Sequence, residues 1–226
     1  DGEARQYYCV DVKEPGTLGR LIKADGKNPM KIRNLKVSGT ISDEDFYFMR
    51  DSMAILEAVN LKESKVVDVE VTLDHYMDVG NVHVNIDPLS GHNDEYGNST
   101  VFCRREAGIY DHIIPDGAFA GKKSLYYFAF PEKITQIGYG AFQGSSISGA
   151  LVIPCDATHI WSPAFSGTNI SSLVLAPGVE IIGNSVFSAC SGLTSVEFNA
   201  ENCTSMGSYD YPVFSNCTAL STITIG

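Results

Sequence analysis

The chain has 226 residues, with 16 Lys and Arg against 27 Asp and Glu, so its formal net charge is −11. Hydrophobic residues make up 44% of it, which supplies enough apolar material for a core and excludes bulk disorder. An acidic chain lacks the clustered basic side chains that bind phosphates, so no nucleic-acid partner is expected. No apolar run approaches the roughly 20 residues that a membrane span needs, so no transmembrane segment is expected either.

The first part of the chain carries nearly all the charge and shows helix and strand patterns. Residues 1–119 hold 13 of the basic and 21 of the acidic side chains. A short helix is expected over 17–22, because Pro15-Gly16 breaks the chain just before it. Further on, Ser42 is a candidate N-cap, followed by acidic residues that favour a helix start. The pattern therefore predicts a strand over 32–37, a helix from 42 to about 54, and a strand over 56–61.

The next segment changes character. Alternating valines predict strand structure over 66–84, whereas 87–100 is rich in Gly, Asn, Asp and Ser and is predicted to be a long loop. Three histidines and several carboxylates fall within 74–95, and such groups can ligate a metal ion. Their spacing matches no EF-hand loop and no His-Glu-x-x-His pattern. A solvated insertion is the favoured interpretation, with a metal-dependent protein as the alternative; no metal or other cofactor is predicted.

A repeat dominates the second half. A small residue precedes a phenylalanine at Phe119, Phe142, Phe165, Phe187 and Phe214, with spacings of 23, 23, 22 and 27 residues. After each phenylalanine come an aliphatic residue and then an alternating apolar pair, such as Leu151 and Ile153. A unit this small cannot bury its own apolar face, so successive units must stack. The strands are expected to pair in parallel, with the phenylalanines as a stacked internal column.

The resulting domain prediction has two parts. Residues 1–30 form an N-terminal helical cap, and 31–226 form a β-rich α/β solenoid. Within it, 31–108 are degenerate repeats with an insertion near 74–100, and 109–226 are regular repeats of about 23 residues. The longer last spacing fits an insertion around Tyr209-Asp210-Tyr211.

The repeat resembles the BspA-type leucine-rich repeat of bacterial surface proteins. The likeness is carried by Phe187-Ser-Ala-Cys190-Ser-Gly-Leu193 and Phe214-Ser-Asn-Cys217-Thr-Ala-Leu220, and earlier units keep Gly121, Gly144 and Gly167 at the second place after the phenylalanine. The resemblance implies an exported, cell-surface or secreted bacterial protein whose signal has been removed, with a possible lipid anchor upstream of Asp1. It also implies adhesion to a host matrix or surface protein or to a glycan.

The outward positions of the repeat strands are the candidate partner-binding face. That face comprises Tyr126, Tyr127, Ala129, Val152, Val174, Glu197 and Thr224. Solenoids bind partners on such extended faces, and tyrosine is favoured at interfaces. The alternative is a solvated Ser/Thr-rich surface that binds nothing tightly. No nucleophile with a partnered base is evident, so the hypothesis is a non-catalytic adhesion module, with a purely structural surface stalk as the alternative.

Cys190 and Cys217 occupy the same slot in successive units. Stacking places equivalent Cα atoms ~4.8 Å apart, which a disulfide tolerates. Buried thiols fit the slot equally well, and free thiols are favoured because disulfide geometry is exacting. His112 and His159 lie beside repeat strands and are expected to be structural.

Overall fold

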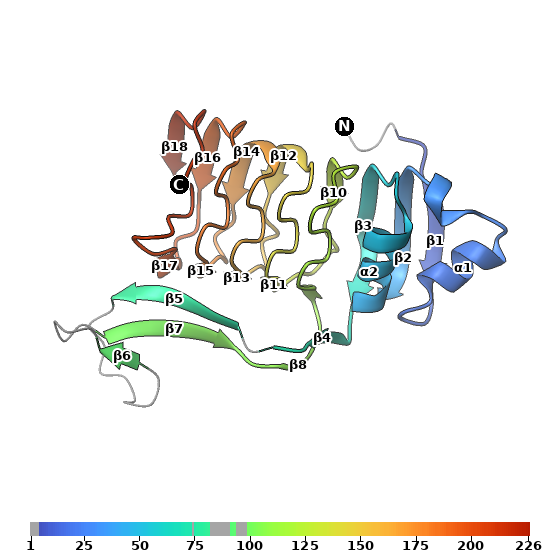
Figure 1. The fold of residues 1–226 in the computed structure, drawn as a ribbon, viewed down its shortest axis with the longest axis horizontal. Coiled ribbons are helices and arrows are strands. Elements are labelled where there is room, and N and C mark those ends of the chain that lie inside the picture. Colours follow the sequence, from blue (N-terminus) through green and yellow to red (C-terminus); the bar gives the residue numbers. More distant parts are fainter. Residues whose placement is uncertain (1–4, 74, 82–90, 94–98) are drawn as a thin grey trace.

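The computed structural model describes residues 5–73, 75–81, 91–93 and 99–226 and shows a coil whose successive turns stack along one axis (Figure 1). The chain is a β-rich solenoid, as the repeat predicted. The helices lie at its N-terminal end, and a long hairpin runs beside the later turns (Figure 1).

Long strands form the main wall of the coil in two four-stranded sheets. The first contains β1 (Tyr8–Val12), β2 (Asn34–Ile41), β3 (Ala58–Val66) and β10 (Tyr127–Ala129). The second contains β12 (Ser148–Val152), β14 (Asn169–Leu175), β16 (Ser195–Phe198) and β18 (Thr222–Ile225). All neighbours within them pair in parallel, which confirms the predicted stacking.

A narrow parallel sheet forms a second wall. It consists of two-residue strands in the order β17-β15-β13-β11-β9. Their bounds are β9 (Ile113–Ile114), β11 (Gln136–Ile137), β13 (His159–Ile160), β15 (Ile181–Ile182) and β17 (Ser205–Met206). Each regular repeat therefore uses one long strand, one short strand and one phenylalanine-bearing corner, whereas helices follow β1 and β2.

The phenylalanines form the predicted internal column. Consecutive rings from Phe119 to Phe214 stack with centroid separations of 5.8, 5.1, 5.4 and 5.7 Å and interplanar angles of 7–18°. The first four of these rings are fully buried. Phe46 meets Phe119 edge-on at 5.9 Å, so the column begins in the N-terminal helical unit.

The N-terminal unit contains α1 (Leu18–Ala24), the 3₁₀ turn η2 (Pro29–Lys31) and α2 (Asp43–Ser52). The helices and the strands β2 and β3 agree with prediction to within a few residues. The strand β1 was not expected: Val10 and Val12 face inward, but two apolar positions are too weak a pattern to identify. β1 adds an edge strand to the first four-stranded sheet and precedes α1 in the chain.

The described residues of the insertion contain strands that were not expected. The valine-rich segment is not one strand: Asp68, with φ of 53°, separates β3 from β4 (Val69–Val71), and β5 (His75–Asn81) follows. The loop prediction over 87–100 is wrong where β6 (Gly91–Asn93) and the start of β7 (Ser99–Arg105) fall. Antiparallel pairing of β4 with β8 (Gly108–Tyr110), and of β7 with β5 and β6, supplies the order that composition alone did not reveal.

Candidate functional site

Four residues of the candidate face form a continuous row. Val152, Val174, Glu197 and Thr224 are direct neighbours across β12, β14, β16 and β18. Their side chains point outward because Leu151, Leu173 and Val196, which alternate with them, are buried. Val152 is 59% exposed, and Glu197 and Thr224 are exposed as well. A shallow depression on this face is lined by residues that include Ser172, Val174, Ser195, Glu197, Asn199 and Thr224.

The two tyrosines lie on the other sheet and are already in contact with another residue. β10 is the last strand of the first sheet and pairs with β3, whereas β12 is the first strand of the second sheet. One main-chain hydrogen bond joins the two sheets here, from Ser148 N to the Tyr126 carbonyl at 3.1 Å. Within the second sheet the register between β12 and β14 shifts after Gly149, where Ser171 of β14 is the extra residue. The Arg5 guanidinium lies 5.1 Å from the ring centroid of Tyr126 and 4.5 Å from that of Tyr127. Both tyrosines are therefore half-buried.

Ala129 does not belong to an accessible face. It alternates with the inward Phe128, yet it is only 6% exposed and offers almost no surface to a partner. The predicted broad face is thus two faces: an exposed row on the second sheet and a tyrosine pair covered by the N-terminal segment. Sequence spacing could not reveal this, because Arg5 is more than a hundred residues away.

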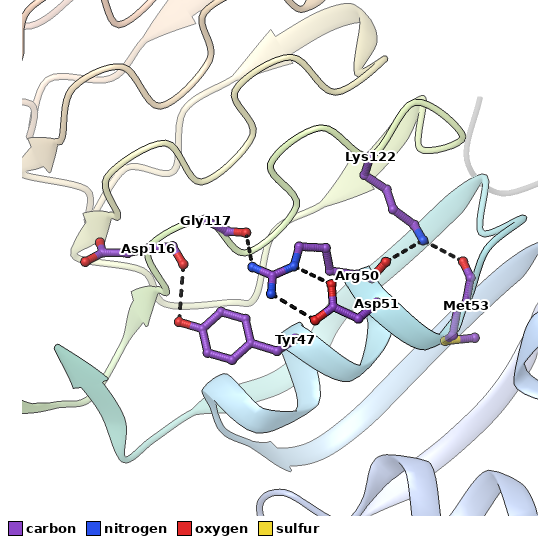
Figure 2. A network of polar contacts seen from close by, with 7 residues as sticks. All are labelled: Tyr47, Arg50, Asp51, Met53, Asp116, Gly117 and Lys122. Atoms are coloured by element: carbon purple, nitrogen blue, oxygen red, sulfur yellow. Dashed lines mark hydrogen bonds and ion pairs between the residues drawn. The ribbon is translucent and has the colours of Figure 1, made fainter. Parts of the chain in front are cut away.

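A polar joint fixes α2 to the first regular repeat (Figure 2). The Lys122 ammonium donates to the carbonyls of Arg50 and Met53 at 2.7 and 2.6 Å, so it satisfies the open C-terminal end of α2. Burial lowers the pKa of Lys122 from its usual 10.5. Arg50 binds both carboxylate oxygens of Asp51 and also the Gly117 carbonyl.

The joint is structural. Tyr47 completes it by donating to the Asp116 carbonyl at 3.2 Å, and the Lys122 and Arg50 cations bind groups of the chain itself (Figure 2). Lys122 was not predicted as a structural residue, because the sequence pattern does not distinguish a buried lysine in a repeat corner from an exposed one. Its role follows only from the position of α2.

A second polar cluster ties the hairpin to the narrow sheet. Arg105, at the end of β7, is 3% exposed, forms an ion pair with Asp116 at 2.5 Å and lies over the Trp161 ring at 4.9 Å. Trp161 donates to Gln136 at 2.9 Å and stacks on His159 with a centroid separation of 6.1 Å. Burial lowers the pKa of His159 from its usual 6.5, so the ring is neutral at pH 7 and packs as a structural histidine. Sequence analysis singled out His159 without its neighbours.

Three cysteines of the regular repeats, Cys190, Cys203 and Cys217, lack the environment of a reactive thiol. Cys190 and Cys217 are free, as favoured from the sequence. Burial raises the pKa of the Cys190, Cys203 and Cys217 thiols above the usual 9.0, which leaves few as nucleophilic thiolates. Among the residues whose side chains the structure describes, no group of three or more His, Cys, Asp or Glu is placed to hold a metal ion.

The metal hypothesis for 74–95 falls outside that part of the chain. Asp74 and residues 82–90 and 94–98 are not described, and neither are the side chains of the remaining residues in 74–103. In the described ranges, no helix is both long and apolar enough to cross a bilayer.

The sequence comparison agrees with the geometry. The profile of the BspA-type leucine-rich repeat region matches six copies over residues 112–226, which is just over half the chain. The chain belongs to this family. The match covers the regular turns, with their stacked phenylalanine corners and paired long and short strands. A search of curated proteins found no match to the chain.

Membership in the BspA-type leucine-rich repeat family places the chain among repeat modules of the kind that engage other proteins. Such solenoids present an extended surface, whereas small-molecule sites are concave pockets with convergent polar groups.

Proposed function

We propose that the chain is a non-catalytic binding module, displayed outside a bacterial cell, that contacts a protein or glycan through the outward row of its second sheet. The row consists of Val152, Val174, Glu197 and Thr224. Tyr126 and Tyr127 lie on the separate first face, against Arg5, and are not part of the row. Ala129 is left out because it is buried.

The observation that carries the proposal is an outward-facing, almost uncharged row across four adjacent parallel strands, in which Val152, Glu197 and Thr224 are exposed and Val174 is half-buried. Neighbouring strands lie about 4.8 Å apart, so the row offers a regular, flat contact line. Glu197 is its one charged residue, and Asn199 donates to that carboxylate at 2.8 Å. Interface cores are depleted of charge in the same way.

Two further observations support a binding role rather than catalysis. Burial raises the pKa of the Cys190, Cys203 and Cys217 thiols. The Lys122 ammonium is bound to main-chain carbonyls. A catalytic nucleophile needs a lowered pKa or an adjacent base. The family resemblance supports the surface location and a matrix-protein or glycan partner.

The test is a screen of the purified chain against immobilised extracellular-matrix proteins and a glycan array. Val152→Arg should weaken binding to any hit at least tenfold, because it puts a long charged side chain at the most exposed apolar position of the row. Met30→Arg is the matched control: Met30 is 60% exposed and Val152 is 59% exposed, and both variants gain one positive charge.

Equal binding by the two variants would remove the row from the proposal. If the wild-type chain binds nothing on either panel, the structural-stalk hypothesis gains support instead. Thermal unfolding followed by circular dichroism should show both variants folded, since each replaces an exposed side chain.

A further inference from the structure

One corner of the coil carries exposed aromatic side chains. The spacing from Phe187 to Phe214 is 27 residues, against 22 or 23 for the earlier units, and the extra residues form a turn over 208–211. Tyr209 is 98% exposed and Tyr211 is 60% exposed, and Asp210 between them is exposed too. Tyrosine is enriched at protein interfaces, so two exposed tyrosines on one turn make it a candidate contact surface.

Main-chain hydrogen bonds hold this turn in place. Tyr211 N donates to the Ser208 carbonyl at 3.2 Å, which closes the turn. On one side Gly207 N donates to the Ile182 carbonyl at 2.8 Å, and on the other Phe187 N donates to the Val213 carbonyl at 3.0 Å. Ser185 N also donates to the Tyr211 carbonyl at 3.2 Å. The turn is therefore anchored on the preceding rung, and a partner would meet a pre-organised surface.

The C-terminal part of the sequence, which includes this turn, has charged side chains of one sign. From residue 134 to the end the sequence contains no Lys and no Arg. It contains five carboxylates over the same length: Asp156, Glu180, Glu197, Glu201 and Asp210. Together with the net charge of −11, this composition attracts cationic partners and repels acidic ones.

The chain itself shows how such residues hold a guanidinium. Arg50 lies 4.8 Å from the ring centroid of Tyr47 while both oxygens of the Asp51 carboxylate accept from it. Arg5 likewise lies over the tyrosine pair of β10. A tyrosine face with a nearby carboxylate is thus an arginine-binding combination within this molecule.

We propose that the turn formed by Tyr209, Asp210 and Tyr211 docks a basic, arginine-bearing segment of a partner protein. Guanidinium groups of that segment lie over the tyrosine rings, and Asp210 pairs with one of them. This turn follows β17 of the narrow sheet, whereas the row lies on the strands of the second sheet, so the two proposals use different residues and are tested separately.

The test uses a fluorescein-labelled ten-residue peptide of alternating Arg and Ser, with binding followed by fluorescence anisotropy at low and physiological salt. The Tyr209→Ala/Tyr211→Ala variant should bind it at least about fivefold more weakly, because exposed cation–π contacts of this kind are each worth roughly a two- to fivefold change. Asp210→Asn should weaken binding about twofold or more, as the loss of an exposed ion pair does. A peptide with citrulline in place of arginine should not bind, since citrulline keeps the shape and loses the charge.

The controls separate docking from general attraction. Asp156→Asn removes the same charge from an exposed position on another turn and should change affinity by less than Asp210→Asn does. A further control adds the two tyrosine substitutions to Val152→Arg, the variant that tests the row. In that background the tyrosine substitutions should weaken peptide binding by the same factor as in the wild-type chain. The proposal is overturned if the wild-type chain does not bind, if the citrulline peptide binds equally, if the tyrosine variant binds like the wild type, or if the two aspartate variants lose affinity equally.

Discussion

The second residue after each phenylalanine adopts a left-handed backbone conformation. Its φ is 69° at Gly121, 65° at Gly144, 69° at Gly167, 55° at Ala189 and 60° at Asn216. Glycine adopts this conformation freely and asparagine tolerates it, whereas alanine meets a steric penalty from its Cβ. The Gly-or-Asn preference of the repeat thus has a local backbone cause, and Ala189 is the one strained member.

Replacing the strained alanine should stabilise the fold. Ala189→Gly is expected to raise the free energy of unfolding by about 1 kcal/mol, measured by urea denaturation, since a left-handed non-glycine residue costs roughly that much. The reverse change, Gly121→Ala, should lower it by a similar amount; a Cβ there meets no atom within 4 Å, so strain is its only effect. A loss of stability in Ala189→Gly would show that the alanine methyl group contributes more by packing than it costs in strain.

At the scale of elements, Asp45 joins the two helices of the N-terminal unit. Its carboxylate is 1% exposed and accepts three main-chain hydrogen bonds, from Gly16 at 2.8 Å, Leu18 at 2.9 Å and Ser42 at 3.0 Å. The Ser42 contact closes the N-terminal end of α2, and the other two fix the start of α1. The Asp45 side chain therefore fixes how α1 packs beside α2. Together these two helices cover the N-terminal end of the coil.

Removing the Asp45 carboxylate should strongly destabilise the N-terminal unit. Asp45→Ala is expected to lower the free energy of unfolding by about 3 kcal/mol, because buried N–H donors lose a charged acceptor. Thermal or urea unfolding measures the change. Glu44→Ala is the matched control: it removes a carboxylate from the same helical turn at an exposed position and should cost only about 0.5 kcal/mol. Similar losses in the two variants would contradict the joining role of Asp45.

At the scale of the whole molecule, the two ends of the coil differ. The first strand, β1, is packed by α1, whereas β18 pairs only with β16 and is exposed along its length. Ile223 and Ile225 are 56% and 80% exposed, while the equivalent Leu173 and Leu175 of β14 are at most 1% exposed. In a stacked array each rung is stabilised by its neighbours, so a strand paired on one side is held less firmly than one paired on both.

Hydrogen exchange should follow this difference. In the 226-residue chain, amides of β18 are expected to exchange at least about a hundredfold faster than those of β14, because edge rungs open locally without unfolding the centre. Mass spectrometry of peptides covering each strand measures this, with β1 expected to lie between the two. Protection of β18 equal to that of β14 would mean that another molecule covers the edge.

The sequence was informative wherever a feature repeats. Phe142, Phe165 and Phe187 recur in phase with their aliphatic neighbours, and a unit too small to fold alone must stack, so the solenoid, its parallel pairing and its internal column all followed. Ser42 with its acidic followers likewise predicted α2. The row from Val152 to Thr224 was accessible to the same reasoning, since strand alternation decides which side chains point outward.

Features made by a single long-range contact were decided only by the tertiary structure. Arg5 over the tyrosine pair, Lys122 at the end of α2 and Arg105 between Asp116 and Trp161 each join segments that no periodicity relates. The division of the main wall, the burial of Ala129 and the order within the insertion belong to the same class. Periodic side chains report a structure that repeats many times along the chain, whereas a unique contact leaves its partners as ordinary residues until folding brings them together.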